Sequence, residues 1–252
     1  YSHATDVSTK NDAYGWGGSY GLIGLPYAKL LHWYPNFAFG SYTSSGQAAW
    51  AVDASADGEW VVFGGEFPRV NGTAQQGLVR FRSRAGAPNT SGPTYATVPS
   101  TPTPTTTATS LSAGEVRVSF GSAWDYDDEE LTYALYRNNT LINTQTAKSN
   151  FWTLPRLGYV DTGLPAGTTV NYRVRITDAN GNGLWSLTSN TVTVGNGSPS
   201  AYANLVRSDG AQHLWRLGES SGTTALDWAS FDDLTMNGGY TRGADGAIIG
   251  DD

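Results

Sequence analysis

The chain of 252 residues contains no cysteine and a single methionine, and only 15% of its residues are charged. Without cysteine it can form no disulfide, no thiolate metal site and no cysteine nucleophile. No apolar run approaches the roughly 18 residues that a membrane-spanning helix requires, so the sequence predicts no membrane span. Basic residues are also scarce, since 15 Lys and Arg against 22 Asp and Glu give a net charge of −7. That charge argues against nucleic acid as a partner, because phosphate neutralisation needs clustered basic side chains.

Glycine and aromatic residues are abundant instead, with 31 Gly, nine Trp and fourteen Tyr. Together with frequent Thr, Ser and Val, they are the residues of strands and turns, and they exclude an α-helical bundle. The composition therefore predicts an all-β protein. Its low charge and its Thr- and Trp-rich strands are typical of an exported protein, so we expect an extracellular or cell-surface location. Because the chain begins at Tyr1 without a methionine, we interpret it as a mature or trimmed product.

Proline and threonine crowd residues 93–109. Pro99, Pro102 and Pro104 remove backbone donors, so the core of this stretch cannot lie in a central strand. We interpret it as an extended Pro/Thr linker, with an O-glycosylated stalk as the alternative. A second, weaker boundary is the cluster of turn residues at 195–199. The chain is thus predicted to have three segments, residues 1–98, 99–195 and 200–252.

The first segment carries short alternating stretches at 49–54, 59–64 and 77–82, separated by glycine-rich turns. Its motifs are GGEF at 64–67, VNG at 70–72 and GLVRF at 77–81, preceded by LHWYP at 31–35. This series resembles the blade repeat of bacterial secreted β-propellers. The resemblance covers about one blade and part of another, whereas a closed propeller typically has about 4–8 blades. Residues 1–98 are therefore predicted to form a propeller-like meander of incomplete terminal blades.

The second segment has the clearest strand pattern. Apolar and polar residues alternate with a period of two at 115–120, 131–137 and 170–176. This pattern places Val116, Leu131 and Tyr172, with their alternate neighbours, inside a β-sandwich. With DTGLPAG at 161–167 and YRV at 172–174, the segment resembles a fibronectin type III domain. It departs from that family at Phe120, where Trp is common, and at Val170, where the corner tyrosine is expected. Tyr172 is the candidate substitute.

The third segment contains HLWRLGE at 213–219 and SGTTALD at 221–227. These motifs resemble the opening of a laminin-G/concanavalin-like jelly roll. About 50 residues of such a domain bury too little apolar area to fold alone and leave strand edges unpaired. We therefore expect a partial jelly roll that continues in a longer parent chain or pairs with other strands.

An acidic run at 125–130 is the one candidate metal site. Asp125, Asp127 and Asp128 offer the hard oxygen ligands that Ca²⁺ prefers. The alternative is a solvated loop between two strands of the sandwich. The sequence predicts no cofactor other than this calcium alternative.

Tryptophan supplies the candidate ligand contacts, because an exposed indole can stack on a sugar ring. Trp50, Trp60 and Trp215 fall in alternating strands and are expected in the core. The candidate glycan-stacking residues are Trp16, Trp33, Trp152 and Trp185.

No combination of residues matches a catalytic motif. His3, His32 and His213 occur in unrelated contexts, and none has a partner at the spacing of a metal site or a serine nucleophile. His213 is expected to be structural. The acidic residues that could act in glycoside hydrolysis are scattered along the chain, namely Glu59, Glu66, Glu219 and Asp227. The chain is therefore predicted to be non-catalytic.

Three functional hypotheses follow. The leading one is a bacterial extracellular or cell-surface multidomain protein that binds or adheres to glycans or other surface polymers. The second is a structural subunit of an extracellular filament or phage tail appendage, in which copies of the chain, or the rest of a longer one, complete the partial domains by strand pairing. The third is the accessory region of a secreted glycan-degrading enzyme.

Overall fold

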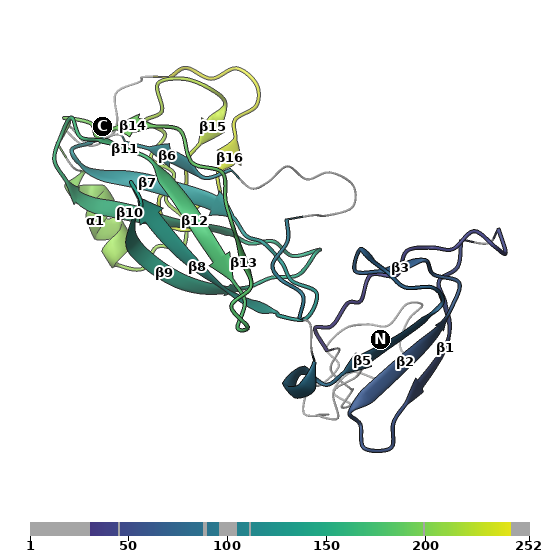
Figure 1. The fold of residues 1–252 in the computed structure, drawn as a ribbon. Coiled ribbons are helices and arrows are strands. Elements are labelled where there is room, and N and C mark those ends of the chain that lie inside the picture. The colour runs from purple at the N-terminus through teal and green to yellow at the C-terminus, as the bar shows by residue number, and fades with distance from the viewer. Residues whose placement is uncertain are drawn as a thin grey trace, which may run out of the picture. The chain divides into compact units, whose positions relative to one another are not determined.

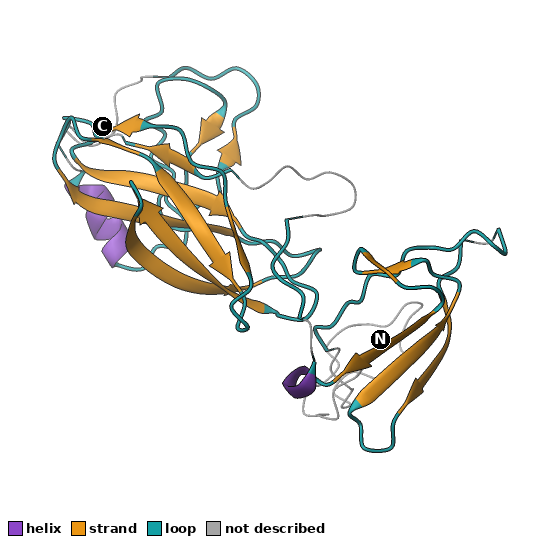
Figure 2. Cartoon of the chain, viewed as in Figure 1, coloured by secondary structure: helices purple, strands orange, loops and turns teal. Residues whose placement is uncertain are grey.

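The computed structural model describes residues 31–44, 46–87, 90–95, 105–110, 112–198 and 200–242. The chain divides into two compact units, Tyr1–Ser91 with Tyr126–Asp128, and Gly92–Asp125 with Glu129–Asp252. Antiparallel strands dominate both units (Figure 1), and helices are few (Figure 2). The predicted all-β fold class is therefore confirmed. Most of the Pro/Thr stretch, residues 96–104, lies outside the described residues.

The first unit is built on a three-stranded antiparallel sheet in the order β1-β2-β5. A turn that contains Gly58 joins β1 to β2, and a two-stranded hairpin lies between β2 and β5. Asn71 and Gly72 form the turn of that hairpin with φ values of 48° and 77°, which an Asn-Gly pair tolerates well. The strands are β1 (Ala49–Ala54), β2 (Trp60–Gly65), β3 (Arg69–Val70), β4 (Thr73–Ala74) and β5 (Leu78–Arg82), followed by a short 3-10 helix, η1 (Arg84–Gly86).

Aromatic rings form the interior of this unit. Phe37 lies at the centre, with ring centroids 4.9 Å from Phe67, 5.2 Å from Phe63 and 6.3 Å from Phe81. Among the described residues of the unit, only Phe67 and Val70 are fully buried apolar side chains. Within the described residues, few apolar side chains of this unit are therefore fully buried.

The expectation that Trp50 is a core residue is wrong, since its side chain is 56% exposed. It lies where the β1–β2 register shifts between Ala49 and Ala51, in a strand that forms one edge of the sheet. All six residues of β1 are exposed, so neither face of this edge strand is buried and an alternating pattern cannot mark a core position there. Trp60 and Trp215 are partly buried.

The second unit contains a β-sandwich. One sheet has the order β10-β7-β6 and the other the order β13-β12-β8-β9, and a short pair, β11 and β14, lies beside them. The strands are β6 (Thr107–Thr109), β7 (Gly114–Gly121), β8 (Glu130–Arg137), β9 (Thr140–Lys148), β10 (Arg156–Leu164), β11 (Thr169–Val170), β12 (Tyr172–Thr177), β13 (Gly183–Trp185) and β14 (Val192–Thr193).

The core of the sandwich lies between the two sheets and follows the predicted alternation. Every inward position of β7, β8 and β12 that the sequence pattern identified is buried. The residues are Val116, Val118, Phe120, Leu131, Tyr133, Leu135, Tyr172, Val174 and Ile176. Phe120, which replaces the expected Trp, is 1% exposed and fills its position in the core.

A buried polar cluster closes one end of the core. The Tyr172 hydroxyl donates to Asp161 Oδ2 at 2.8 Å, and Arg137 Nη1 contacts both oxygens of the same carboxylate at 3.0 Å. Tyr172 therefore bonds to a side chain in β10. Burial raises the pKa of the Tyr172 hydroxyl, and its bond to Asp161 raises it further.

Residues 200–242 pack on the outer face of the β10-β7-β6 sheet. Helix α1 (Ala201–Ser208) begins after Ser200, whose hydroxyl accepts from the Ala203 amide, and a short pair of strands follows, β15 (Thr224–Ala225) and β16 (Leu234–Thr235). The Phe231 ring contacts β10 at Gly158, where a Cβ atom would lie 2.3 Å from that ring.

The covered face contains charged residues of β7. Arg117, only 2% exposed, forms an ion pair with Asp233 and donates from Nε to the Asp227 carbonyl oxygen at 2.8 Å. Glu115 is paired with Arg207 of α1 at 2.9 Å. The C-terminal segment is thus held to the sandwich by buried ion pairs as well as by Phe231.

Candidate functional site

The outer face of the β13-β12-β8-β9 sheet presents an indole among polar side chains. Strand register places Arg175 beside Trp185 and Ala134, and Arg173 beside Tyr136. The adjoining positions carry threonines, namely Thr132 on β8, Thr144 and Thr146 on β9, and Thr177 on β12. We call these outward side chains the Trp185 face, which consists of Thr132, Ala134, Tyr136, Thr144, Thr146, Arg173, Arg175, Thr177 and Trp185.

Neighbouring side chains hold the Trp185 ring in place. The Arg173 guanidinium carbon lies 4.2 Å from the indole centroid and that of Arg175 lies 5.6 Å away. Tyr136 meets the indole edge-on, with a centroid distance of 5.1 Å. Trp185 is nevertheless 39% exposed. Cation–π and edge-to-face contacts therefore order an indole that still faces solvent, which is the condition for a stacking surface.

Arg173 and Arg175 were not predicted as site residues, although the sequence carries a signal for them. Both occupy the positions of β12 between the buried residues Tyr172, Val174 and Ile176. The same alternation that placed those residues in the core places the arginines outside.

The other three candidate tryptophans lie elsewhere. Trp152 is in the loop between β9 and β10, 56% exposed, with the Phe151 ring perpendicular to it at 4.4 Å. Trp33 packs edge-on against Phe81 at 5.0 Å, within the aromatic interior of the first unit. Trp16 lies outside the described residues.

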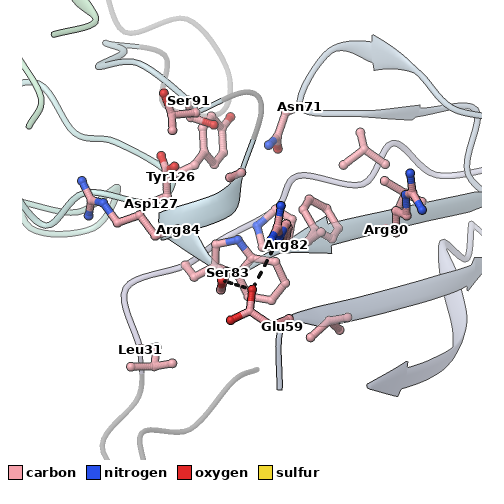
Figure 3. A pocket seen from close by; sticks show the side chains of 18 of the residues that line it. Leu31, Glu59, Asn71, Arg80, Arg82, Ser83, Arg84, Ser91, Tyr126 and Asp127 are labelled. Atoms are coloured by element: carbon pink, nitrogen blue, oxygen red, sulfur yellow. Dashed lines mark hydrogen bonds and ion pairs between the residues drawn. The ribbon is translucent and has the colours of Figure 1, made fainter. Parts of the chain in front are cut away.

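A cavity of about 680 Å³ opens in the first unit (Figure 3). Trp33 and Phe81 contribute apolar surface to it, and Glu59, Arg82 and Ser83 contribute polar groups. These polar groups bond to one another, since Glu59 Oε2 accepts from Ser83 Oγ at 2.9 Å and lies 3.5 Å from Arg82 Nε. Glu59, Arg82 and Ser83 thus satisfy one another, and we do not assign ligand binding to this cavity.

The acidic loop between β7 and β8 brings three carboxylates together. One oxygen each of Asp125, Asp127 and Asp128 lies within 4.8 Å of the others. Arg84 forms an ion pair with Asp128, so part of the negative charge is neutralised by the protein. Three carboxylates could contribute to a cation site, but Ca²⁺ usually takes six to eight oxygen ligands.

His213 has two side-chain partners that the sequence pattern did not predict. Its Nδ1 atom lies 2.7 Å from Asp227 Oδ2 and 2.8 Å from Ser230 Oγ. A serine–histidine–aspartate triad requires the hydroxyl and the carboxylate on opposite ring nitrogens, whereas here both contact Nδ1. The ring also stacks on Trp215, with centroids 5.0 Å apart and planes 5° apart. This geometry suits a structural anchor.

The Asp227 carboxylate is the centre of that anchor and is fully buried. Burial alone would raise its pKa, but hydrogen bonds outweigh burial and hold the pKa well below the usual range. The donors are Ser230 Oγ and the backbone amides of Leu214 and Ala229, together with His213. Asp227 is therefore ionised and fixed in place at neutral pH.

Comparison with known proteins gives one partial similarity. The chain is 32% identical to exoglucanase B of Cellulomonas fimi over 181 residues, which cover 65% of this chain and 16% of that enzyme. No protein-family model matches the chain. Within the described residues, no helix is both long enough and apolar enough to cross a membrane.

Proposed function

We propose that this chain is a non-catalytic, glycan-binding region of an extracellular multidomain protein, and that the Trp185 face is its binding surface. One observation carries the proposal, an ordered and solvent-facing indole surrounded by hydrogen-bonding side chains on an open sheet. Rigid aromatic rings provide contact area with little loss of conformational entropy, and a few placed polar groups provide specificity.

The partial similarity to exoglucanase B supports glycans as the ligand class, since that enzyme is named for its action on glucan. The similar region spans only 16% of the enzyme. This favours the third of our hypotheses, in which the chain accompanies a glycan-degrading enzyme, over a free-standing adhesion protein.

The arrangement of the candidate catalytic groups supports a non-catalytic role. His213 is bonded through one nitrogen to the fixed Asp227 carboxylate. Glu59 is bonded by Ser83, and Glu66 by the Thr43 hydroxyl. These groups act as local structural acceptors. We expect no release of reducing ends when the protein is incubated with soluble glucan, xylan or pectin.

Native affinity electrophoresis with those glycans in the gel tests the proposal. We expect at least one glycan to retard the protein, and Trp185→Ala to weaken that retardation at least tenfold, which corresponds to about 1.4 kcal/mol. Trp152→Ala is the matched control, because it removes an exposed indole of the same unit outside the Trp185 face. Equal retardation of the two variants, or no retardation by any glycan, would contradict the proposal.

Assembly by strand pairing is a second candidate, and the first unit carries the observation that favours it. No described strand pairs with the outer edge of β1 or of β5. Large apolar side chains near these edges are exposed, namely Trp50, Val52 and Leu78. Unpaired edges of this kind invite pairing with another strand. Analytical ultracentrifugation distinguishes the candidates, since assembly predicts oligomers that Val52→Lys disrupts.

A further inference from the structure

We infer that the Trp185 face recognises an acidic polysaccharide, one whose sugar rings carry carboxylates. The inference rests on the proposed glycan-binding function and specifies its ligand class. Arg173 and Arg175 supply two positive charges to this face, and neither forms an ion pair with any carboxylate of the described residues. In addition, Arg173 Nε is buried and makes no hydrogen bond. A buried donor without an acceptor is uncommon and points to a missing partner.

The first unit offers an internal comparison. There, Trp60 is also flanked by two arginines, with the guanidinium carbons of Arg80 and Arg82 at 4.8 Å and 5.2 Å from its centroid. The protein supplies a carboxylate to one of these two arginines, because Glu59 lies 3.5 Å from Arg82 Nε. On the Trp185 face no described carboxylate takes the equivalent place. The difference suggests that the acidic group comes from the ligand.

The chemistry of the face fits a uronic acid unit. The planar guanidinium fork binds a carboxylate with two parallel hydrogen bonds. The indole of Trp185 offers a flat apolar surface for the pyranose ring that carries the carboxylate, and the surrounding threonines offer hydroxyl groups to the ring hydroxyls. A polymer of such units would follow the sheet and repeat these contacts.

The overall charge of the chain makes this binding selective. With a net charge of −7, the protein as a whole repels a polyanion. Attraction must therefore come from the local pair of arginines, and added salt should weaken it.

Affinity electrophoresis of the full chain in gels that contain polygalacturonate tests the inference. Fully methyl-esterified polygalacturonate is the matched ligand, because it keeps the sugar backbone and removes the charge. We expect the acidic polymer to bind at least tenfold more tightly than its ester. Arg173→Gln with Arg175→Gln should remove that preference, while Arg80→Gln with Arg82→Gln, at the Glu59-paired site, should leave it unchanged. Thermal melts establish that each variant is folded.

Each alternative outcome contradicts the inference. Equal binding of the acid and its ester, or equal binding by the Arg173→Gln/Arg175→Gln protein, would mean that the arginines only order the indole. Equal binding of dextran sulfate would mean that the face accepts any polyanion. If a neutral glucan binds in a Trp185-dependent way and charge has no effect, the proposed function stands and this inference fails. If no glycan of either kind binds, both fail.

Discussion

Removal of one partner from the Arg117–Asp233 ion pair should strongly destabilise the second unit. Asp233→Ala leaves the Arg117 guanidinium, 2% exposed, with the Asp227 carbonyl oxygen as its remaining hydrogen-bond acceptor. Burial already lowers the pKa of Arg117, and the Asp233 and Asp227 carboxylates counteract that effect. The variant removes one of the two carboxylates that oppose the cost of burying this cation.

The magnitude follows from the burial of the pair. Breaking a buried ion pair by deleting one partner typically lowers the free energy of unfolding by about 3–5 kcal/mol. In a unit of this size, a loss of about 1 kcal/mol lowers the melting temperature by about 2–4 °C, so we expect a fall of about 6–20 °C. Replacement of both partners, as in Arg117→Met/Asp233→Leu, should restore most of the stability, because no uncompensated charge is then buried.

Urea unfolding followed by tryptophan fluorescence provides the measurement, and Glu129→Ala is the matched control. Glu129 is paired with Lys148, and their side chains are 41% and 63% exposed, respectively. Loss of this exposed pair should lower the free energy of unfolding by about 0–1 kcal/mol. If Asp233→Ala lowers the free energy of unfolding by no more than Glu129→Ala does, water must reach the Arg117 guanidinium. The packing of residues 200–242 on the sandwich would then be refuted.

Three further predictions concern buried polar groups and the acidic loop. Tyr172→Phe should lower the free energy of unfolding by about 1–3 kcal/mol, measured by urea denaturation, since it removes a donor to the buried Asp161 carboxylate. Because the pKa of Asp227 is lowered in the folded protein, its ionised carboxylate stabilises the folded state. This stabilisation is complete above the unfolded-state pKa of about 3.9 and is lost as the pH falls below it. The stability difference between wild type and Asp227→Asn should therefore shrink below about pH 4, and a constant difference would contradict this. Because Arg84 is paired with Asp128, Ca²⁺ should leave the melting temperature unchanged beyond the effect of ionic strength, whereas a rise that a chelator reverses would contradict this.

The interior of the sandwich could be predicted from the sequence because a period of two identifies one buried face of a strand. The same pattern says nothing of what covers the other face. In β7, Arg117 alternates with core valines and would be assigned to solvent, yet it is 2% exposed and bonds to Asp227 and Asp233 of the C-terminal segment. Strand periodicity describes a single sheet, whereas this contact joins residues more than 100 positions apart.

The candidate site could be predicted only in part, for a related reason. The sequence made Trp185 a candidate glycan-stacking residue, which stays a prediction. Arg173 and Arg175 joined that candidate only because strand pairing brings them beside it. The partnership of His213 with Asp227 was missed because the residues are 14 positions apart, a separation that matches no short catalytic or metal-binding motif.

The unequal covering of the two units has a consequence for their local opening. Every residue of β2 remains partly exposed, while buried and partly exposed residues alternate along most of β8 against a filled core. Local opening needs the least free energy where few apolar contacts are lost. Amide protons of β2 should therefore exchange with solvent deuterium well before those of β8. The aromatic interior of the first unit would be the first place where a protease or a binding strand gains access to the backbone.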